Sequence, residues 1–299
     1  MKLLQVKNAH PRNTEFIIRA CALFGIDYHN THVSCPDNNN YDIIWAPTEW
    51  IDPDNYPNTR FIFGPHFWVF PDTESPLFMK SRGEHAKRCI YVCLSDWNRA
   101  VMNEFIDLSK QVIPHLPIPF GIQTEVAIVP KTMYEYDCII YCKARHPTFL
   151  NLCAGFLRER NMNYVVFRYG SYEKDDYFAA LAKARFVIWI GSHESQGFAL
   201  EECLASNTPI YVYDVTSMKC EFNDNRYVYE DSSKQLLATS APYWSDQCGI
   251  KVRTHDEFIS RFPEFLRNIP SYTPAAYVQA TLTDRVCFQR ILDGLHMTV

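Results

Sequence analysis

The chain has 299 residues, which is long for one compact domain and comfortable for two. Its net charge is -5 and its lysines and arginines gather into no basic patch, so a nucleic acid partner is disfavoured. No apolar run reaches the length of a membrane span, and the first residues, MKLLQV, lack the long apolar stretch of a secretion signal.

The eleven cysteines are odd in number and include no CxxC pair. Most lie in apolar runs such as residues 89–93 and 138–142, where positions i and i+4 of a strand face the same side. Buried, reduced thiols are therefore predicted, without a zinc site. Together with the N-terminal sequence, this predicts a cytoplasmic protein, because the cytosol keeps thiols reduced.

In the N-terminal half, short apolar runs alternate with amphipathic stretches. Strands are predicted at residues 3–6, 41–47, 60–65 and 89–95. One helix is predicted at 14–25, with Thr14 as its cap and Gly25 as its stop, and another at 96–109 after Ser95. This alternation is typical of an open parallel sheet with helices on both faces.

Three prolines and a glycine interrupt the pattern at residues 112–122, and the pattern then restarts. Further strands are predicted at 136–142, 164–170, 185–191 and 209–214. Further helices are predicted at 149–161, 175–184, 198–206, 256–268 and 276–295. The predicted fold class is α/β, with two Rossmann-like, doubly wound domains facing a cleft. We expect an N-terminal domain at 1–125 and a C-terminal domain at 126–299, with the final helix packing back on the N-terminal domain.

The most informative segment is IGSHESQGFALEECLASNTPIYVYD, residues 190–214. A predicted strand ends at Gly191, a polar loop follows, and a helix begins near Gly197 or Phe198. A helix N-terminus presents unpaired amides and partial positive charge, which suit a phosphate, and Gly197 lets a ligand approach the backbone. Glu194 in the loop and Glu202 in the helix can accept hydrogen bonds from vicinal hydroxyls. The segment therefore predicts a nucleotide-sugar pocket.

This segment resembles the retaining GT-B glycosyltransferases of the large glycogen synthase-like and mannosyltransferase-like group. That group has a Glu, seven residues and a second Glu, with Gly, Ala and Pro at fixed offsets. The matching residues here are Glu194, Gly197, Glu202, Ala205 and Pro209. Gln196 stands where the group often has Phe, and Asn207 where it often has Gly, but the register is intact. The resemblance covers about residues 90–215, including an interdomain-like segment at 95–102 and 116–125.

The resemblance also implies roles for individual residues. Lys143 and Arg145 follow the first strand of the second half, where the group places a basic pair on the donor diphosphate. Glu202 would hold the ribose diol, and Glu194 the sugar hydroxyls beside the anomeric carbon. The remaining donor-side candidates are Gly197, Phe198 and Ala199 for phosphate, Tyr169, Gly170 and Tyr172 for the base, and His193 beside the sugar.

Residues that follow two predicted strands of the N-terminal half are candidates for contacting the acceptor. They are His10, Arg12, Asn13 and His66. Each has a structural alternative, as a turn residue or as a histidine satisfied within the fold. Asp52-Pro53-Asp54 has the Asp-x-Asp form of metal-dependent GT-A transferases, but its prolines favour a turn, so no metal site is expected.

The activity implied by the resemblance is transfer of a sugar from a nucleoside diphosphate donor, UDP or GDP, to an acceptor hydroxyl on a glycan. The anomeric configuration would be retained, and no cofactor beyond the donor substrate is expected. Alternatives are a nucleotide-sugar epimerase or hydrolase on the same fold, and a degenerate transferase that serves as a binding module. A DNA-modifying glucosyltransferase is disfavoured by the negative net charge.

Overall fold

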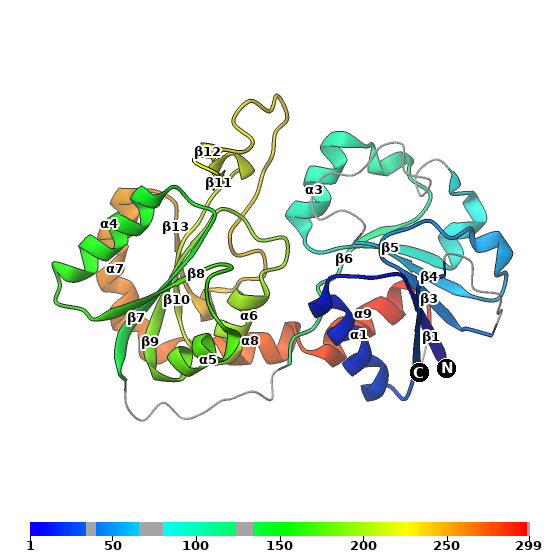
Figure 1. The fold of residues 1–299 in the computed structure, drawn as a ribbon, viewed down its shortest axis with the longest axis horizontal. Coiled ribbons are helices and arrows are strands. Elements are labelled where there is room, and N and C mark those ends of the chain that lie inside the picture. Colours follow the sequence, from blue (N-terminus) through cyan, green and yellow to red (C-terminus); the bar gives the residue numbers. More distant parts are fainter. Residues whose placement is uncertain (34–39, 66–79, 124–133, 298–299) are drawn as a thin grey trace. The chain divides into compact units, whose positions relative to one another are not determined.

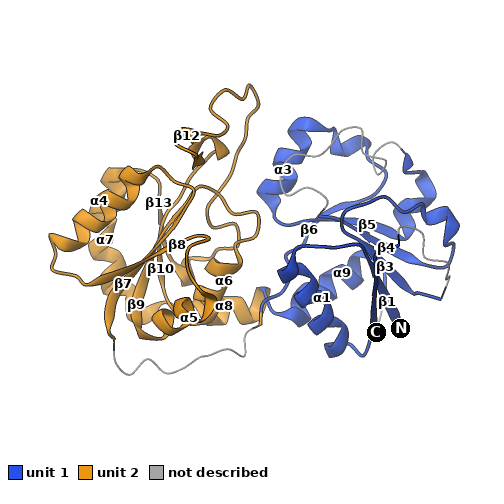
Figure 2. Ribbon diagram, in the orientation of Figure 1, with its two compact units in different colours: residues 1–122, 282–299 blue, residues 123–281 orange. Residues whose placement is uncertain are grey.

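The computed structural model describes residues 1–33, 40–65, 80–123 and 134–297, which form two compact units (Figures 1 and 2). Unit 1 comprises Met1–Ile122 and Leu282–Val299, and unit 2 comprises Gln123–Thr281. The chain therefore returns to unit 1 for its last helix. No helix of the described part is long and apolar enough to cross a membrane.

Unit 1 is built on a six-stranded parallel sheet with the order β2-β1-β3-β4-β5-β6. Its strands are β1 (Lys2–Val6), β2 (Asp27–Thr31), β3 (Ile43–Ala46), β4 (Arg60–Phe63), β5 (Cys89–Cys93) and β6 (His115–Pro117). Its helices are α1 (Pro11–Leu23), α3 (Asp96–Phe105) and α9 (Asp284–Gly294), with short 3-10 turns at Pro53–Asn55, Gly83–Lys87 and Leu108–Lys110. Strands β3 and β5 are buried throughout, as their continuous apolar runs require.

The last helix of unit 1 is fixed by aromatic packing and by one ion pair. Phe288 of α9 contacts the rings of Phe16 and Phe24, with ring centroids 6.2 and 5.2 Å away. Arg19 of α1 donates from Nε to Asp284 at 2.8 Å, and its Nη2 donates to the carbonyl of Gly121. One guanidinium thus joins α1, the start of α9 and the turn at the end of the first segment.

Unit 2 has a five-stranded parallel sheet with the order β13-β10-β9-β7-β8. Its strands are β7 (Tyr136–Lys143), β8 (Tyr164–Arg168), β9 (Ala184–Gly191), β10 (Ile210–Tyr213) and β13 (Gly249–Val252), with a separate hairpin of β11 (Phe222–Asn223) and β12 (Arg226–Tyr227). The helices are α4 (Pro147–Arg158), α5 (Lys174–Lys183), α6 (Phe198–Ala205), α7 (His255–Asn268) and α8 (Pro274–Thr281), with 3-10 turns at Met218–Cys220, Asp246–Cys248 and Ile269–Ser271.

Helices cover both faces of the unit 2 sheet (Figure 1). Alternate residues of β7, such as Cys138 and Ile140, share one core with Phe156 of α4 and Phe258 of α7. Tyr141, the next residue after Ile140, packs on the opposite face against Tyr177 of α5. The described cysteines are free thiols, and all except Cys220 are buried, so the predicted burial is confirmed for them.

Some predicted boundaries were wrong for identifiable reasons. The first helix begins at Pro11 and not at Thr14, because the side chain of His10 accepts from the amide of Arg12 and caps it. The predicted helix at 276–295 is two helices, since Thr283 caps a new helix by accepting from the amide of Val286. Three edge strands, β2, β6 and β13, were not predicted, nor was the hairpin of β11 and β12. The sequence of β2, DYHNT, is polar and carries no run of apolar residues.

Candidate functional site

The candidate site lies at the carboxyl edge of the unit 2 sheet, where the strand order changes direction. β7 and β9 are neighbours, and Lys143 at the end of β7 pairs with Gly191 at the end of β9. The chain leaves β7 for α4 on one face of the sheet and leaves β9 for α6 on the other (Figure 1). Such a switch point opens a crevice beyond the strand ends, which is where ligands bind in open α/β sheets.

A partly buried ion pair occupies this switch point. Lys143 Nζ lies 2.7 Å from Glu194 Oε2, and the two side chains are 22% and 7% exposed. Burial lowers the pKa of Lys143, but the charge and the hydrogen bond of Glu194, together with Tyr169 and Glu221, raise it overall. The ammonium also lies 4.4 Å from the ring centroid of Tyr169, which adds a cation–π contact. The fold therefore holds a charged lysine and a carboxylate in contact at the strand ends.

Gly197 shapes the loop that carries Glu194. It is the N-cap of α6 with φ +94°, a conformation that residues with a side chain rarely adopt. A Cβ at this position would lie 3.2 Å from Cβ of Glu194, so the loop also needs the space. A glycine cap has no side chain to accept from the first amides of α6. The amides of Phe198 and Ala199 thus belong to a helix N-terminus of the kind that binds phosphate.

The second glutamate of the motif lies on α6 itself. Glu202 is 8% exposed, and its Oε1 lies 3.4 Å from Lys174 Nζ at the start of α5. The Tyr172 hydroxyl pairs with that of Tyr141 at 3.1 Å. Burial raises the pKa of Tyr172, and the charges of Glu202 and Glu194 raise it further. Tyr172 thus lies within the electrostatic influence of both carboxylates, and its hydroxyl stays neutral.

Arg145 is not part of the Lys143–Glu194 group. It is 7% exposed, its Nη1 donates to the carbonyl of Gly191 at 2.9 Å, and its guanidinium stacks 4.1 Å from the ring centroid of Phe149. Ala144, with φ +47°, breaks the strand geometry between the two basic residues. Their side chains therefore make different contacts: Lys143 pairs with Glu194, and Arg145 donates to the carbonyl that ends β9.

His193 is held by a partner that the sequence did not indicate. Its Nε2 lies 2.6 Å from Glu221 Oε2, and the second oxygen of Glu221 accepts from Asn223. Both side chains of the pair are buried, at 4% and 11% exposed. Glu221 stands 28 positions after His193, and Lys174 stands 28 before Glu202, so only the fold brings either pair together. No spacing rule could have found Glu221 or Lys174.

The base-side candidates lie on the loop after β8. Tyr169 is exposed and its amide donates to the carbonyl of Cys142, which ties the loop to the end of β7. Gly170 follows with φ +75° and turns the chain back toward Tyr172. The predicted donor-side residues Lys143, Glu194, Gly197, Tyr169 and Tyr172 are thus gathered at one edge of one sheet.

The acceptor-side candidates that the structure describes lie at the start of α1 in unit 1. His10 caps the helix, Arg12 lies 3.8 Å from Glu15, and Asn13 is buried. His66 lies outside the described residues. For His10, the structure shows the structural role that the sequence left open.

The Asp-x-Asp segment of unit 1 forms a 3-10 turn in which Asp52 accepts from the amide of Asp54. Asp52, Asp54 and His85 have ligand atoms within 4.8 Å of one another. Asp54, however, is paired with Arg82 at 2.8 Å and lies 3.7 Å from Arg88. Two guanidinium groups already balance its charge, which disfavours a divalent cation there.

No protein-family model and no curated protein matches this sequence. Comparison with solved structures finds the GT-B glycosyltransferase fold, an α/β architecture with parallel sheets. AviGT4, a glycosyltransferase involved in avilamycin A biosynthesis, matches with a TM-score of 0.55 and 12% identity over 99% of this chain and 97% of its own. Sucrose-phosphate synthase from Thermosynechococcus elongatus matches with 0.53 and 10% identity, covering 99% of both chains. The lipopolysaccharide outer core galactosyltransferase WaaB matches with 0.50 and 10% identity, covering 99% of both.

Proposed function

We propose that this protein is a glycosyltransferase that moves a sugar from a nucleoside diphosphate donor to a hydroxyl of a glycan. The observation that carries the proposal is the contact between Lys143 and Glu194 at the β7–β9 switch point, 2.7 Å apart and next to the N-terminus of α6. A cation, the first amides of a helix and two carboxylates within one edge of a sheet suit a diphosphate joined to two polyols. The fold shared with known glycosyltransferases supports the same class.

In this proposal Lys143 and the first amides of α6 bind the diphosphate and stabilise the negative charge that grows on it as the bond to the sugar breaks. Glu194 accepts from sugar hydroxyls and orients the anomeric carbon. Glu202 accepts from the ribose diol. Arg145 acts as a positioning residue, because its Nη1 is used by the carbonyl that ends β9.

Retention of configuration follows from the resemblance of the Glu194 to Glu202 segment to retaining enzymes. The acceptor oxygen then bonds to the anomeric carbon on the face that the diphosphate leaves, and its proton passes to the departing phosphate oxygen. No separate protein base is needed. Since Lys143 and helix amides supply the charge compensation, we expect activity to persist in EDTA. From the free cysteines we also propose a cytoplasmic location.

A thermal-shift screen with UDP, GDP, ADP, TDP and CMP, alone and as their sugars, tests the proposal. A nucleotide at 100 times its Kd should stabilise the protein by about 2.7 kcal/mol. Products of the stabilising donor, analysed with and without glycan acceptors, then separate transfer from hydrolysis or epimerisation. If no nucleotide stabilises the protein, the donor site assignment is wrong and a binding module becomes the better description.

A further inference from the structure

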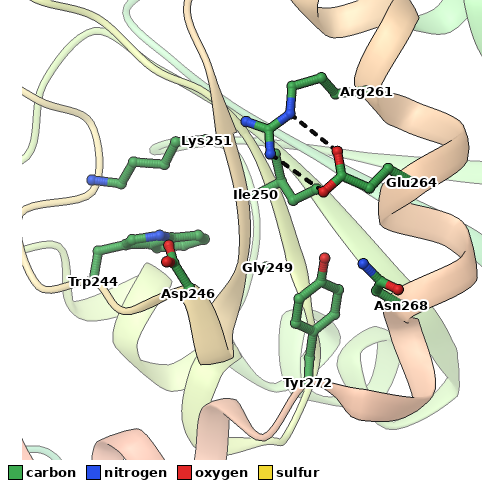
Figure 3. A pocket seen from close by; sticks show the side chains of 9 residues that line it. All are labelled: Trp244, Asp246, Gly249, Ile250, Lys251, Arg261, Glu264, Asn268 and Tyr272. Carbon is green, nitrogen blue, oxygen red and sulfur yellow. Dashed lines mark hydrogen bonds and ion pairs between the residues drawn. The ribbon is translucent and has the colours of Figure 1, made fainter.

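A pocket of about 370 Å³ lies at the outer edge of the unit 2 sheet (Figure 3). Edge strand β13, helix α7 and the segment around Trp244 form its walls. The lining residues are Trp244, Asp246, Gly249, Ile250, Lys251, Arg261, Glu264, Asn268 and Tyr272. None of them belongs to the candidate donor site.

The pocket is distinct from the donor site by its position along the strands. Gly249, at its floor, starts β13 and pairs with Ile210 at the start of β10. The donor-side residues follow the opposite ends of the parallel strands, beyond Lys143 and Gly191. A ligand in this pocket would therefore be bound away from the donor phosphates.

The charged groups of the pocket balance one another. Arg261 Nε lies 3.2 Å from Glu264 Oε2, as Figure 3 shows. Lys251 Nζ donates to the carbonyl of Ala241 at 2.6 Å and lies 3.9 Å from Asp214. Both cations are thus already engaged within the protein, and Asp246 and Glu264 add two negative charges. This arrangement disfavours an anionic ligand and suits a neutral one.

The remaining lining groups offer ring faces and neutral hydrogen-bonding groups. Trp244 and Tyr272 are each partly exposed, and Tyr272 is braced by stacking on Phe265 with centroids 5.6 Å apart. The Tyr272 hydroxyl lies beside the Asn268 amide, and Glu264, one turn earlier on α7, lies on the same side of the pocket (Figure 3). Aromatic faces combined with amide, hydroxyl and carboxylate groups match the alternating apolar and hydroxyl surfaces of a sugar ring.

We propose that this pocket is a second saccharide site that binds an uncharged sugar unit of a glycan. Its volume falls within the range of small-ligand pockets. Lys251 Nζ lies over the Trp244 ring, 5.3 Å from its centroid, so the opposite ring face supplies the stacking surface. Tyr272, Asn268 and Glu264 supply hydrogen bonds to the hydroxyls. The inference goes beyond sugar transfer and does not depend on it, because a glycan can be retained here whatever happens at the donor site.

Saturation-transfer NMR on the full chain tests the proposal, with methyl glycosides of glucose, galactose, mannose and N-acetylglucosamine, and with maltose and lactose, as probes. UDP and GDP are included to occupy the donor site. We expect at least one neutral sugar to bind, and Trp244→Ala to weaken it by about tenfold or more. Trp244→Phe should retain part of the affinity, while Tyr227→Ala, which removes an exposed ring elsewhere in unit 2, should change nothing.

Asn268→Ala provides a second variant on an exposed helix position, where unfolding is not expected. Binding of wild type to none of these sugars would overturn the proposal, as would unchanged affinity in both Trp244→Ala and Asn268→Ala. Preferential binding of inorganic phosphate, abolished by Arg261→Ala, would overturn the neutral-ligand assignment. Glu202→Ala separates the two proposals: at the nucleotide concentration used for wild type it should show a smaller nucleotide-induced stabilisation, while its affinity for the sugar is unchanged.

Discussion

In each unit the end of the first strand is followed by a histidine–proline helix cap three residues after a lysine, and the two lysines are used differently; the left-handed residue is Lys7 in unit 1 and Ala144 in unit 2. In unit 1, Lys7-Asn8-Ala9-His10-Pro11 follows β1, and in unit 2, Lys143-Ala144-Arg145-His146-Pro147 follows β7. In both, the histidine is the N-cap, its Nδ1 accepts from the amide two residues on at 3.3 Å, and the proline opens the helix. The strand that carries the turn lies at the switch point of its sheet in both units.

The difference lies in what the neighbouring strand presents to the lysine. Lys143 meets the buried carboxylate of Glu194, which the loop after β9 supplies. Among the described residues of unit 1, Lys7 forms no ion pair; its amide donates to the carbonyl of Thr31, and its own carbonyl accepts from Gln5 Nε2. The shared turn is therefore a scaffold for starting a helix. The chemistry comes from the loop that follows the adjacent strand.

The largest expected effect comes from removing the ammonium group in each turn. Lys143→Met should lower kcat by about 100- to 1000-fold, as for loss of one preorganised group that stabilises transition-state charge. Lys7→Met should change kcat by less than about twofold, because the same turn lacks the partner carboxylate. Initial rates at saturating donor measure both variants.

Lys143→Met also leaves Glu194 buried without its counter-charge, so thermal unfolding must first show that the variant is folded at the assay temperature. Lys143→Arg then serves as the charge-preserving control and should recover part of the rate. Equal rates for the Lys143→Met and Lys7→Met variants would mean that Lys143 contributes no more to catalysis than Lys7 does.

The second effect concerns how each unit treats a buried ionisable group. Glu194 keeps Lys143 charged, whereas burial lowers the pKa of His115, in unit 1, to about 4. The unfolded chain takes up a proton at this histidine below about pH 6.5, and the native state does so only near pH 4. The contribution of His115 to the free energy of unfolding should thus be fully present above pH 6.5 and should fall by about 2–3 kcal/mol as the pH drops toward 4.

The measurement is denaturant unfolding at several pH values between 4 and 7.5, comparing wild type with His115→Gln. The variant should be less stable at neutral pH, because it disturbs a buried side chain that hydrogen-bonds the carbonyl of Ile113. Its stability should nevertheless change less with pH than that of wild type. Parallel pH profiles would show that His115 does not differ in proton binding between the two states.

The third effect separates the two glutamates of unit 2. Glu202→Ala should weaken the free nucleoside diphosphate by about 10- to 150-fold, the loss of a hydrogen bond to a charged group. Glu194→Ala should leave that affinity nearly intact and lower the rate at saturating donor. Lys174→Ala is the matched control for Glu202, since it removes the ion-pair partner and keeps the carboxylate. Calorimetry with the nucleotide, together with initial rates, distinguishes these outcomes, and wild-type behaviour of both glutamate variants would contradict the donor site.

The elements that sequence reasoning found are those with continuous apolar runs. The central strands β4, β5, β7, β9 and β10 were predicted in this way, because strands buried on both faces carry few polar residues. The edge strand β2 is held by backbone pairing with β1 and not by an apolar pattern, so it left no sequence signal.

The candidate site divides along the same line. Gly197 and Glu202 could be placed from the local sequence, because a strand, a loop and a helix follow one another there. The Lys143–Glu194 contact joins positions 51 apart, and it depends on β7 and β9 becoming neighbours. The diverging paths of Lys143 and Arg145 depend on the positive φ of Ala144, which no propensity of alanine predicts.

The smallest expected effect tests whether the two turns are equivalent as scaffolds. Asparagine is a strong N-cap, so His10→Asn should keep the cap of α1 and leave the stability of unit 1 within about 0.5 kcal/mol. His146→Asn should keep the cap of α4 but remove a ring that lies 4.6 Å from Phe222 and 6.1 Å from Tyr227. We expect it to cost about 0.5–1.5 kcal/mol, the worth of such aromatic pairs.

His10→Ala and His146→Ala should each lose about a further 1 kcal/mol, because both then lack the cap. Calorimetric unfolding of the four variants gives these differences. An equal loss for His10→Asn and His146→Asn would show that the Phe222 and Tyr227 contacts add nothing, and that the two turns differ only at their lysines.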